Sequence, residues 1–151
     1  MFKLFYKYNN GFYLNVEIYD DFSKSNLAIN IENLKLYFID KVKISNKFKL
    51  KINTIAEKLY YIEFFTDDKN TRDVLIHFFS PQKELLPPWV VFPDIFDGSP
   101  RWNQGVEEDY SIKYWIPYWK TLDTFSKDKY LEKYNCNIEW KEWLSSNINY
   151  F

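Results

Sequence analysis

Apolar and aromatic runs of strand length dominate the first 80 positions, and from Leu34 to Ile52 apolar and polar residues alternate with a period of two, which is typical of β-strands. The first two aromatic-rich runs are separated by Asn9-Asn10-Gly11, a strong turn signal, and predict a β-hairpin. Further along, two almost continuously apolar runs predict a second pair of strands, buried on both faces. The four predicted strands are residues 2–8, 12–19, 59–65 and 74–79.

Between these pairs, the even positions from Leu34 to Ile52 are apolar apart from Asp40 and Asn46, which predicts another hairpin. A loop with an odd number of residues, 45–47, is favoured over a two-residue loop, because only that register keeps the apolar side chains of both strands on one face. The same register aligns lysines across the strands as Lys43 with Lys49 and Lys41 with Lys51. This lysine stripe is either an anion-binding site or, as the simpler interpretation, a solvated face that keeps the sheet soluble.

The pattern changes at Pro81, where prolines, tryptophans and short apolar clusters predict a loop without regular helix up to residue 105. From Val106 the apolar positions recur at helical spacing, and acidic residues occupy the first turn, where the helix dipole favours them. Pro117 lies inside this pattern, so we expect the helix to kink there or to restart with Pro117 in its first turn. Ser126 and Asn137 are predicted to cap two further helices. The side chains expected to face inward are Ile112, Trp115, Ile116, Trp119, Leu122, Ile138, Trp140 or Lys141, and Leu144.

These elements predict an α+β fold, an N-terminal antiparallel β-meander packed against C-terminal helices in a single domain of residues 1–151. Residues 1–80 are expected to be mostly strands, 81–105 a loop rich in proline and tryptophan, and 106–146 helices. The length of 151 residues is enough to bury one core, and an aromatic content of 22% excludes a disordered chain.

Charge is balanced over the whole chain and uneven along it. The 20 basic and 21 acidic residues argue against a general nucleic-acid binder, which would be strongly basic. Residues 1–80 carry 12 Lys/Arg and 10 Asp/Glu, whereas residues 81–151 carry 8 and 11. A lone cysteine, Cys136, fits a reducing compartment. With no pattern of a secretory signal or membrane helix, a cytoplasmic protein is expected.

The residue inventory also limits the chemistry. A Ser-His-Asp or Cys-His nucleophile would have to use His77, the single histidine, which the pattern places in a strand as a structural residue. His77 and Cys136 are too few for a zinc site, and three glycines do not make a phosphate-binding loop. We therefore expect a protein that is not an enzyme and that holds no metal or cofactor.

Carboxylates and aromatic residues gather between positions 94 and 110, and they are the candidate partner-binding residues. Acids steer a basic protein partner and aromatic side chains fill its pockets, so a nuclease or another toxin acting on nucleic acid fits this surface. The alternative is a carbohydrate-active or carbohydrate-binding protein that uses a cleft in the Trp89–Trp119 region. A purely structural interpretation makes the acids helix N-terminal charges and the tryptophans core residues. The candidates are Asp94, Asp97, Trp102, Glu107, Glu108, Asp109 and Tyr110.

About 45 residues of the C-terminal part carry a pattern that resembles the immunity proteins of bacterial contact-dependent growth inhibition and polymorphic toxin systems. The resemblance implies a cytoplasmic antitoxin that binds and neutralises a cognate toxin domain, without direct contact to nucleic acid or membrane. The matching residues are Trp102-Asn103-Gln104-Gly105, Glu108, Tyr110, Trp115, Pro117, Trp119, Leu122, Tyr130-Leu131, Trp140 and Trp143-Leu144.

Overall fold

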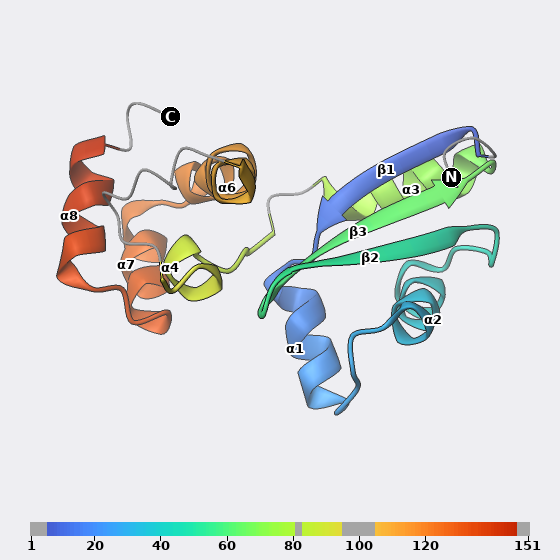
Figure 1. Ribbon diagram of the computed structural model, residues 1–151, viewed down its shortest axis with the longest axis horizontal. Helices are drawn as coiled ribbons and strands as arrows, with labels where there is room; N and C mark the ends of the chain where they lie inside the picture. Colours follow the sequence, from blue (N-terminus) through green and yellow to red (C-terminus); the bar gives the residue numbers. More distant parts are fainter. Residues whose placement is uncertain (1–5, 81–82, 95–104, 148–151) are drawn as a thin grey trace. The chain divides into compact units, whose positions relative to one another are not determined.

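The computed structural model describes residues 6–80, 83–94 and 105–147, and the chain divides into two compact units (Figure 1). The first unit is Met1–Lys83 and the second is Glu84–Phe151. The predicted mixed fold is confirmed, because the N-terminal half holds a three-stranded antiparallel sheet and the helices lie mostly in the C-terminal half.

The strands of the first unit pair in the order β1-β3-β2, which differs from the sequential order of a meander. Both pairs are antiparallel, with Phe12 opposite Ile62 and Ile52 opposite the same residue on the other side. Within the described residues the elements are β1 (Tyr8–Tyr13), α1 (Val16–Lys24), α2 (Ile31–Val42), β2 (Lys49–Ala56), β3 (Leu59–Thr66) and α3 (Lys69–Phe79).

The core of the first unit lies between the sheet and its helices. Figure 1 shows α3 lying along β1 and β3, and α2 beside β2. Phe12 of β1 stacks on Phe79 of α3 with ring centroids 4.3 Å apart, and Phe38 of α2 meets Phe64 of β3 edge to face. The buried cluster comprises Leu14, Ile18, Phe22, Leu34, Phe38, Ile44, Phe48, Leu50, Ile62, Phe64 and Leu75. Burial of such side chains contributes about 1.5–3 kcal/mol each, which makes this cluster the main source of stability in the first unit.

The predicted turn at Asn9-Asn10-Gly11 is wrong, because these residues lie within β1 and pair with β3. Gly11 serves packing instead, since a Cβ atom added to it would come within 1.8 Å of the Tyr61 hydroxyl oxygen. The predicted strand over residues 12–19 ends at Tyr13, and helix α1 follows. Residues 2–5 of the other predicted strand lie outside the described residues.

The first half of the hairpin predicted over residues 34–52 is also wrong, because it forms helix α2. Leu34 and Phe38, one turn apart, enter the core, whereas Leu36 between them is 56% exposed. Residues 45–47 therefore connect a helix to a strand. Even so, the apolar residues Ile44, Phe48 and Leu50 are buried, as the pattern predicted.

The predicted cross-strand lysine pairs do not exist. Lys41 lies on α2 and pairs with Glu17 and Asp21 of α1. Lys43 ends α2 in the left-handed conformation, with φ of 60°. Lys49 and Lys51 alone belong to a strand, so the lysines of this region are distributed over a helix, its end and an edge strand.

The strand predicted over residues 74–79 is helix α3. Its N-terminus is capped by Asp68, whose side chain accepts a hydrogen bond from the Thr71 backbone N–H at 3.1 Å. Leu75 enters the core from this helix. His77 is exposed on it, so its predicted place as a structural strand residue is wrong.

The second unit has no strand in its described part, and the predicted helices after Val106 are confirmed. The expectation of no regular helix up to residue 105 is wrong at the short helix over Pro88–Val91. Asn137 caps the last helix by accepting the Trp140 N–H at 2.9 Å. The preceding helix is capped by Asp123 rather than by the predicted Ser126, whose own backbone N–H is the donor to Asp123. The elements are α4 (Pro88–Val91), α5 (Gly105–Glu108), the π-helix η3 (Asp109–Trp115), α6 (Ile116–Thr121), α7 (Thr124–Lys133) and α8 (Ile138–Asn147).

Pro117 explains the π-helix. It lies in the first turn of α6, the second of the two predicted possibilities. In a continuous α-helix its ring would clash with the carbonyl of Lys113, four residues earlier. The wider turn places the Ile116 N–H on the Ser111 carbonyl, five residues back. The Ser111 hydroxyl is fully buried without a hydrogen-bond partner in the described part of the chain, which adds to the energetic cost of this turn.

An aromatic core fills the second unit. Trp115 is fully buried and Trp119 is 4% exposed, as predicted, and their rings stack with centroids 5.4 Å apart. Trp140 and Leu144 are also buried, whereas Ile138 is 65% exposed and not inward as predicted. Trp115, Trp119 and Trp140 are therefore core residues of this unit.

Candidate functional site

The candidate partner-binding residues differ in how far they reach the surface. Asp94 and Glu108 are exposed, and Asp109 is half-buried with a carboxylate oxygen 3.3 Å from the Lys113 ammonium nitrogen. Glu107, by contrast, is largely buried within α5. Asp97 and Trp102 lie outside the described residues. Among the described residues of this segment, the accessible acidic groups are therefore Asp94, Glu108 and part of Asp109.

Tyr110 is not part of an open surface, so the expectation that it meets a partner is corrected. It is fully buried and its hydroxyl donates to the Leu86 carbonyl at 2.6 Å. Its ring also meets Phe92 edge to face. Tyr110 therefore anchors the chain before α4.

Further polar anchors hold the segment before α4. The indole N–H of Trp115 donates to the Tyr130 hydroxyl oxygen at 2.8 Å, and the Tyr130 hydroxyl donates to the Leu85 carbonyl. Burial raises the Tyr130 pKa well above its ordinary value, so the hydroxyl keeps its proton. Glu84 accepts hydrogen bonds from Lys133, the last residue of α7, and from the hydroxyl of Tyr134, the C-cap of that helix. The backbone that leads towards the acidic residues is thus fixed by side chains distant in sequence.

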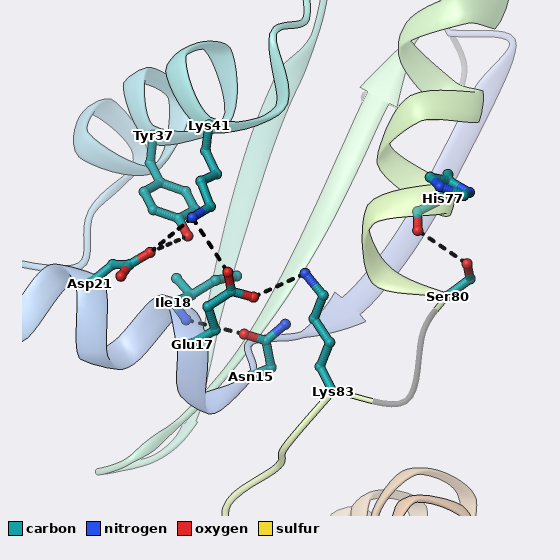
Figure 2. A network of polar contacts seen from close by, with 9 residues as sticks. All are labelled: Asn15, Glu17, Ile18, Asp21, Tyr37, Lys41, His77, Ser80 and Lys83. Atoms are coloured by element: carbon teal, nitrogen blue, oxygen red, sulfur yellow. Dashed lines mark hydrogen bonds and ion pairs between the residues drawn. The ribbon is translucent and has the colours of Figure 1, made fainter.

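A polar network that the sequence did not indicate joins the helices of the first unit (Figure 2). Glu17 accepts a hydrogen bond from Lys83 at 3.0 Å and pairs with Lys41 at 3.4 Å. Asp21 accepts the Tyr37 hydroxyl at 2.8 Å. The hydrogen bond from Lys83 lowers the Glu17 pKa, whereas burial raises the Tyr37 pKa.

This network stabilises the packing of the first unit. It is not a proton-exchanging acid–base pair, because the lysines favour the ionised form of Glu17. Lys83 is also held by Phe78, whose ring centroid is 3.6 Å from the lysine nitrogen. Glu17 and Lys83 are 66 residues apart, so no local pattern in the sequence could have identified the pair. Lys83 attaches the end of the first unit to α1.

His77 lies apart from the Glu17 network on α3 (Figure 2). The Ser80 hydroxyl donates to the His77 backbone carbonyl at 3.1 Å, and not to the imidazole. Within residues 6–80, 83–94 and 105–147, no three His, Cys, Asp or Glu side chains are grouped so that they could hold a metal ion.

Cys136 is buried at the end of α7, and burial raises the pKa of its thiol to about 11. A thiol with a raised pKa is a poor nucleophile at neutral pH. The side chain therefore contributes to packing.

Comparisons with protein-family models, with curated proteins and with solved structures found no match for this chain. In the described part of the chain, no helix combines the length and the apolar character needed to cross a lipid bilayer.

Proposed function

We propose that this chain is a cytoplasmic, non-enzymatic inhibitor of the immunity type, which binds and neutralises a cognate toxin domain through a protein–protein interface. The partner surface is the accessible acidic part of the segment from Asp94 to Asp109, together with Asp97. A basic protein, such as a nuclease domain, is the matching partner, because opposite charges guide association and fix orientation.

One observation carries this proposal, namely that exposed carboxylates stand on a backbone fixed by a buried aromatic core. Asp94 and Glu108 are exposed, while Tyr110 beside them is fully buried and bonded to the Leu86 carbonyl. A preorganised surface loses little conformational entropy on binding, which favours tight association. The second unit carries 7 Lys/Arg and 11 Asp/Glu, so its long-range field also attracts a basic partner.

The carbohydrate alternative receives less support. Stacking on a sugar needs an open ring face, yet Trp115 and Trp119 are buried. The Trp89 ring meets Trp115, Tyr130 and Trp140, and its indole N–H donates to the Tyr134 carbonyl at 2.9 Å. These three tryptophans serve the core of the unit, so protein binding is the better-supported function.

A matched pair of charge reversals tests the proposal. If a toxin domain is encoded beside this gene, Asp94→Lys with Glu108→Lys should weaken binding to it by tenfold or more, about 1.4 kcal/mol. The control is Glu139→Lys with Glu142→Lys, because both residues are exposed on α8 and Glu139, like Glu108, lies in a first helical turn. Calorimetric titration gives the affinity, and thermal unfolding should show the two variants equally folded.

The outcome that contradicts this function is specific. If the toxin domain binds neither the unchanged protein nor its variants, or if both charge reversals weaken binding equally, the acidic segment is not the interface. A growth assay with the toxin domain expressed in the same cells adds the biological readout, because only the unchanged protein and the α8 variant should protect.

A further inference from the structure

A hollow of about 670 Å³ lies in the first unit between the end of α1 and one side of α2. Phe22, which is 2% exposed, forms part of its wall, and the Tyr37 ring lies beside Phe22 with centroids 5.3 Å apart. Leu27 and Leu36 line the same hollow and are 49% and 56% exposed. We call this feature the α1–α2 hollow.

Exposed apolar side chains concentrate in this part of the chain. Among the described residues six large apolar side chains are exposed, and Leu27, Ile31 and Leu36, three of the six, fall within ten consecutive positions. The core of the first unit takes Leu34 and Phe38 from α2, so packing within the unit does not account for a leucine at position 36. Clustered apolar exposure beside a concave surface is typical of an interface.

The α2 side of the hollow is a continuous helical stripe. Asn33, Leu36, Tyr37 and Asp40 recur at spacings of three and four residues, so they share one face of the helix. The 12 residues of α2 make it about 18 Å long. This face is therefore long enough to pack along a second helix.

The charged groups in the wall argue against a partner of strongly single-signed charge. Asp21 and Asp40 are balanced by Lys24 and Lys41. Asp21 accepts the Tyr37 hydroxyl at 2.8 Å and lies 3.8 Å from the Lys41 ammonium nitrogen (Figure 2). A basic or an acidic partner would each meet groups of its own sign. The hollow thus fits a surface that is partly apolar and carries both signs of charge.

Asp40 lies at the unfavourable end of its own helix. It is exposed in the last turn of α2, where the negative end of the helix dipole disfavours a carboxylate. Over the described ranges, none of the salt bridges involves Asp40. The positive N-terminal end of an antiparallel helix beside it would make the same charge favourable.

We infer that two copies of this chain associate through their α1–α2 hollows, with α2 packed antiparallel on α2 of the second copy. A twofold axis between positions 36 and 37 puts Leu36 opposite the second copy's Tyr37, and Asp40 opposite the second copy's Asn33. Each contact then occurs twice, as a twofold interface requires. The Asn33 side-chain nitrogen donates to the Ala28 carbonyl at 2.9 Å, and its other hydrogen can donate to Asp40.

The stripe is therefore complementary to itself, which is what selects a second copy as the occupant. The antiparallel arrangement brings apolar and aromatic side chains together at the centre. It also places each Asp40 beside an amide and the positive end of a helix, and not beside the other Asp40. This surface belongs to the first unit, whereas the acidic segment of the proposed function belongs to the second, so the inference goes beyond that function and does not rest on it.

Sedimentation velocity of the full chain over a hundredfold range of concentration tests the inference. The mass should rise from that of the 18.6 kDa monomer towards twice that value. Leu36→Asp should weaken self-association by tenfold or more, because it places a charge at the centre of the interface. The control is Ile138→Asp, because Ile138 is an apolar residue on α8 that is 65% exposed, and it should change self-association less than twofold.

A second pair of variants tests the antiparallel register. Asn33→Asp should weaken the dimer, since it sets two carboxylates against each other at both ends of the stripe. Asn33→Asp with Asp40→Asn should restore the dimer, because each carboxylate again faces an amide. Both variants lose the amide bond to the Ala28 carbonyl, so their difference reports the charge opposite residue 33 alone.

Three outcomes overturn the inference. The chain could stay monomeric at every concentration, which leaves the hollow to a helix of another protein or to solvent. Leu36→Asp and Ile138→Asp could weaken self-association equally, which places the dimer contact elsewhere. The double variant at positions 33 and 40 could remain as weak as Asn33→Asp, which excludes the antiparallel pairing of α2 with itself.

Discussion

The two units stabilise their cores with different chemistry. In the first unit, the core cluster consists of aliphatic residues and phenylalanines, which bring no polar side-chain atoms into the interior. In the second unit, tryptophans and tyrosines fill the core, and their polar atoms bond to the Leu85, Leu86 and Tyr134 carbonyls. An aromatic core with polar atoms therefore fixes irregular chain segments as well as burying apolar area.

The two units also differ in net charge. The first unit carries 13 Lys/Arg and 10 Asp/Glu, and the second carries 7 and 11. Exposed carboxylates of the second unit stand on chain that tyrosines and tryptophans hold in place. The two units therefore carry net charges of opposite sign.

Trp115→Ala should have the largest effect on stability, because it removes a fully buried indole from the core of the second unit at a cost of about 3–5 kcal/mol. All six tryptophans lie in the second unit, so tryptophan fluorescence monitors that unit alone. We expect the fluorescence-monitored urea transition to shift to much lower urea or to disappear.

Phe38→Ala is the matching change in the core of the first unit. It should shift the unfolding transition followed by circular dichroism to lower urea. The transition followed by tryptophan fluorescence should keep its urea midpoint. Equal shifts of the tryptophan signal in both variants would mean that the two units unfold as one, which would break the comparison.

Tyr130→Phe should have the next largest effect. It deletes one hydroxyl and leaves both the Trp115 indole N–H and the Leu85 carbonyl without their partner, at a cost of about 1–3 kcal/mol. Tyr37→Phe in the first unit removes a half-buried bond to Asp21, for which about 0.5–1.5 kcal/mol is expected. Urea denaturation compares the two, and an equal loss would show that polar atoms in the second core have no special role.

The smallest expected effect concerns the helix caps, Asn15 of α1 and Asp123 of α7. Asn15→Ala should lower stability by about 1 kcal/mol at every pH, because an amide does not titrate in this range. The hydrogen bond from the Ser126 N–H lowers the Asp123 pKa below its ordinary value of 3.8. Its contribution is therefore present above that value and is lost as the pH falls through the folded-state pKa.

The measurement for the caps is thermal unfolding of Asn15→Ala and Asp123→Ala between pH 7 and pH 2.5. The difference between Asp123→Ala and the unchanged protein should shrink at acidic pH, while the Asn15→Ala difference persists. A pH-independent deficit in Asp123→Ala would show that its charge plays no part in the cap.

The elements that the sequence predicted correctly are those with distinctive start signals or an unambiguous period. Asn137 predicted the start of α8, and the helical spacing of Trp115, Ile116 and Trp119 predicted the helix after Val106. The cap of α7 was predicted at Ser126 instead of Asp123, and α4 was not predicted. For α2 the period-two pattern predicted a strand where a helix forms. Strand and helix patterns share positions i and i+4, which Leu34 and Phe38 occupy. The distinguishing position, Leu36, is apolar yet exposed, so the pattern favoured a strand.

For α3 the continuous apolar run carried no period at all, and the cap at Asp68 was the usable signal. For the candidate site, the acidic composition drew attention to Asp94 and Glu108, and both are exposed. The burial of Tyr110 was missed, because it depends on where successive residues point around a helix. Contacts such as Glu17 with Lys83 join positions 66 residues apart, and only the folded chain brings them together.

The strand order has a consequence for the time course of synthesis. The partners of β1 in β3 lie 48 to 58 positions later in the chain, from Tyr13 with Tyr61 to Tyr8 with Thr66. At the usual rate of ribosomal elongation, β1 waits roughly 3–10 s for them. Once β2 and β3 have both been synthesised, their hairpin forms in about 1–10 μs. Of the described strands β1 is therefore the earliest to leave the ribosome, and it stays unpaired until the central strand β3 has been synthesised.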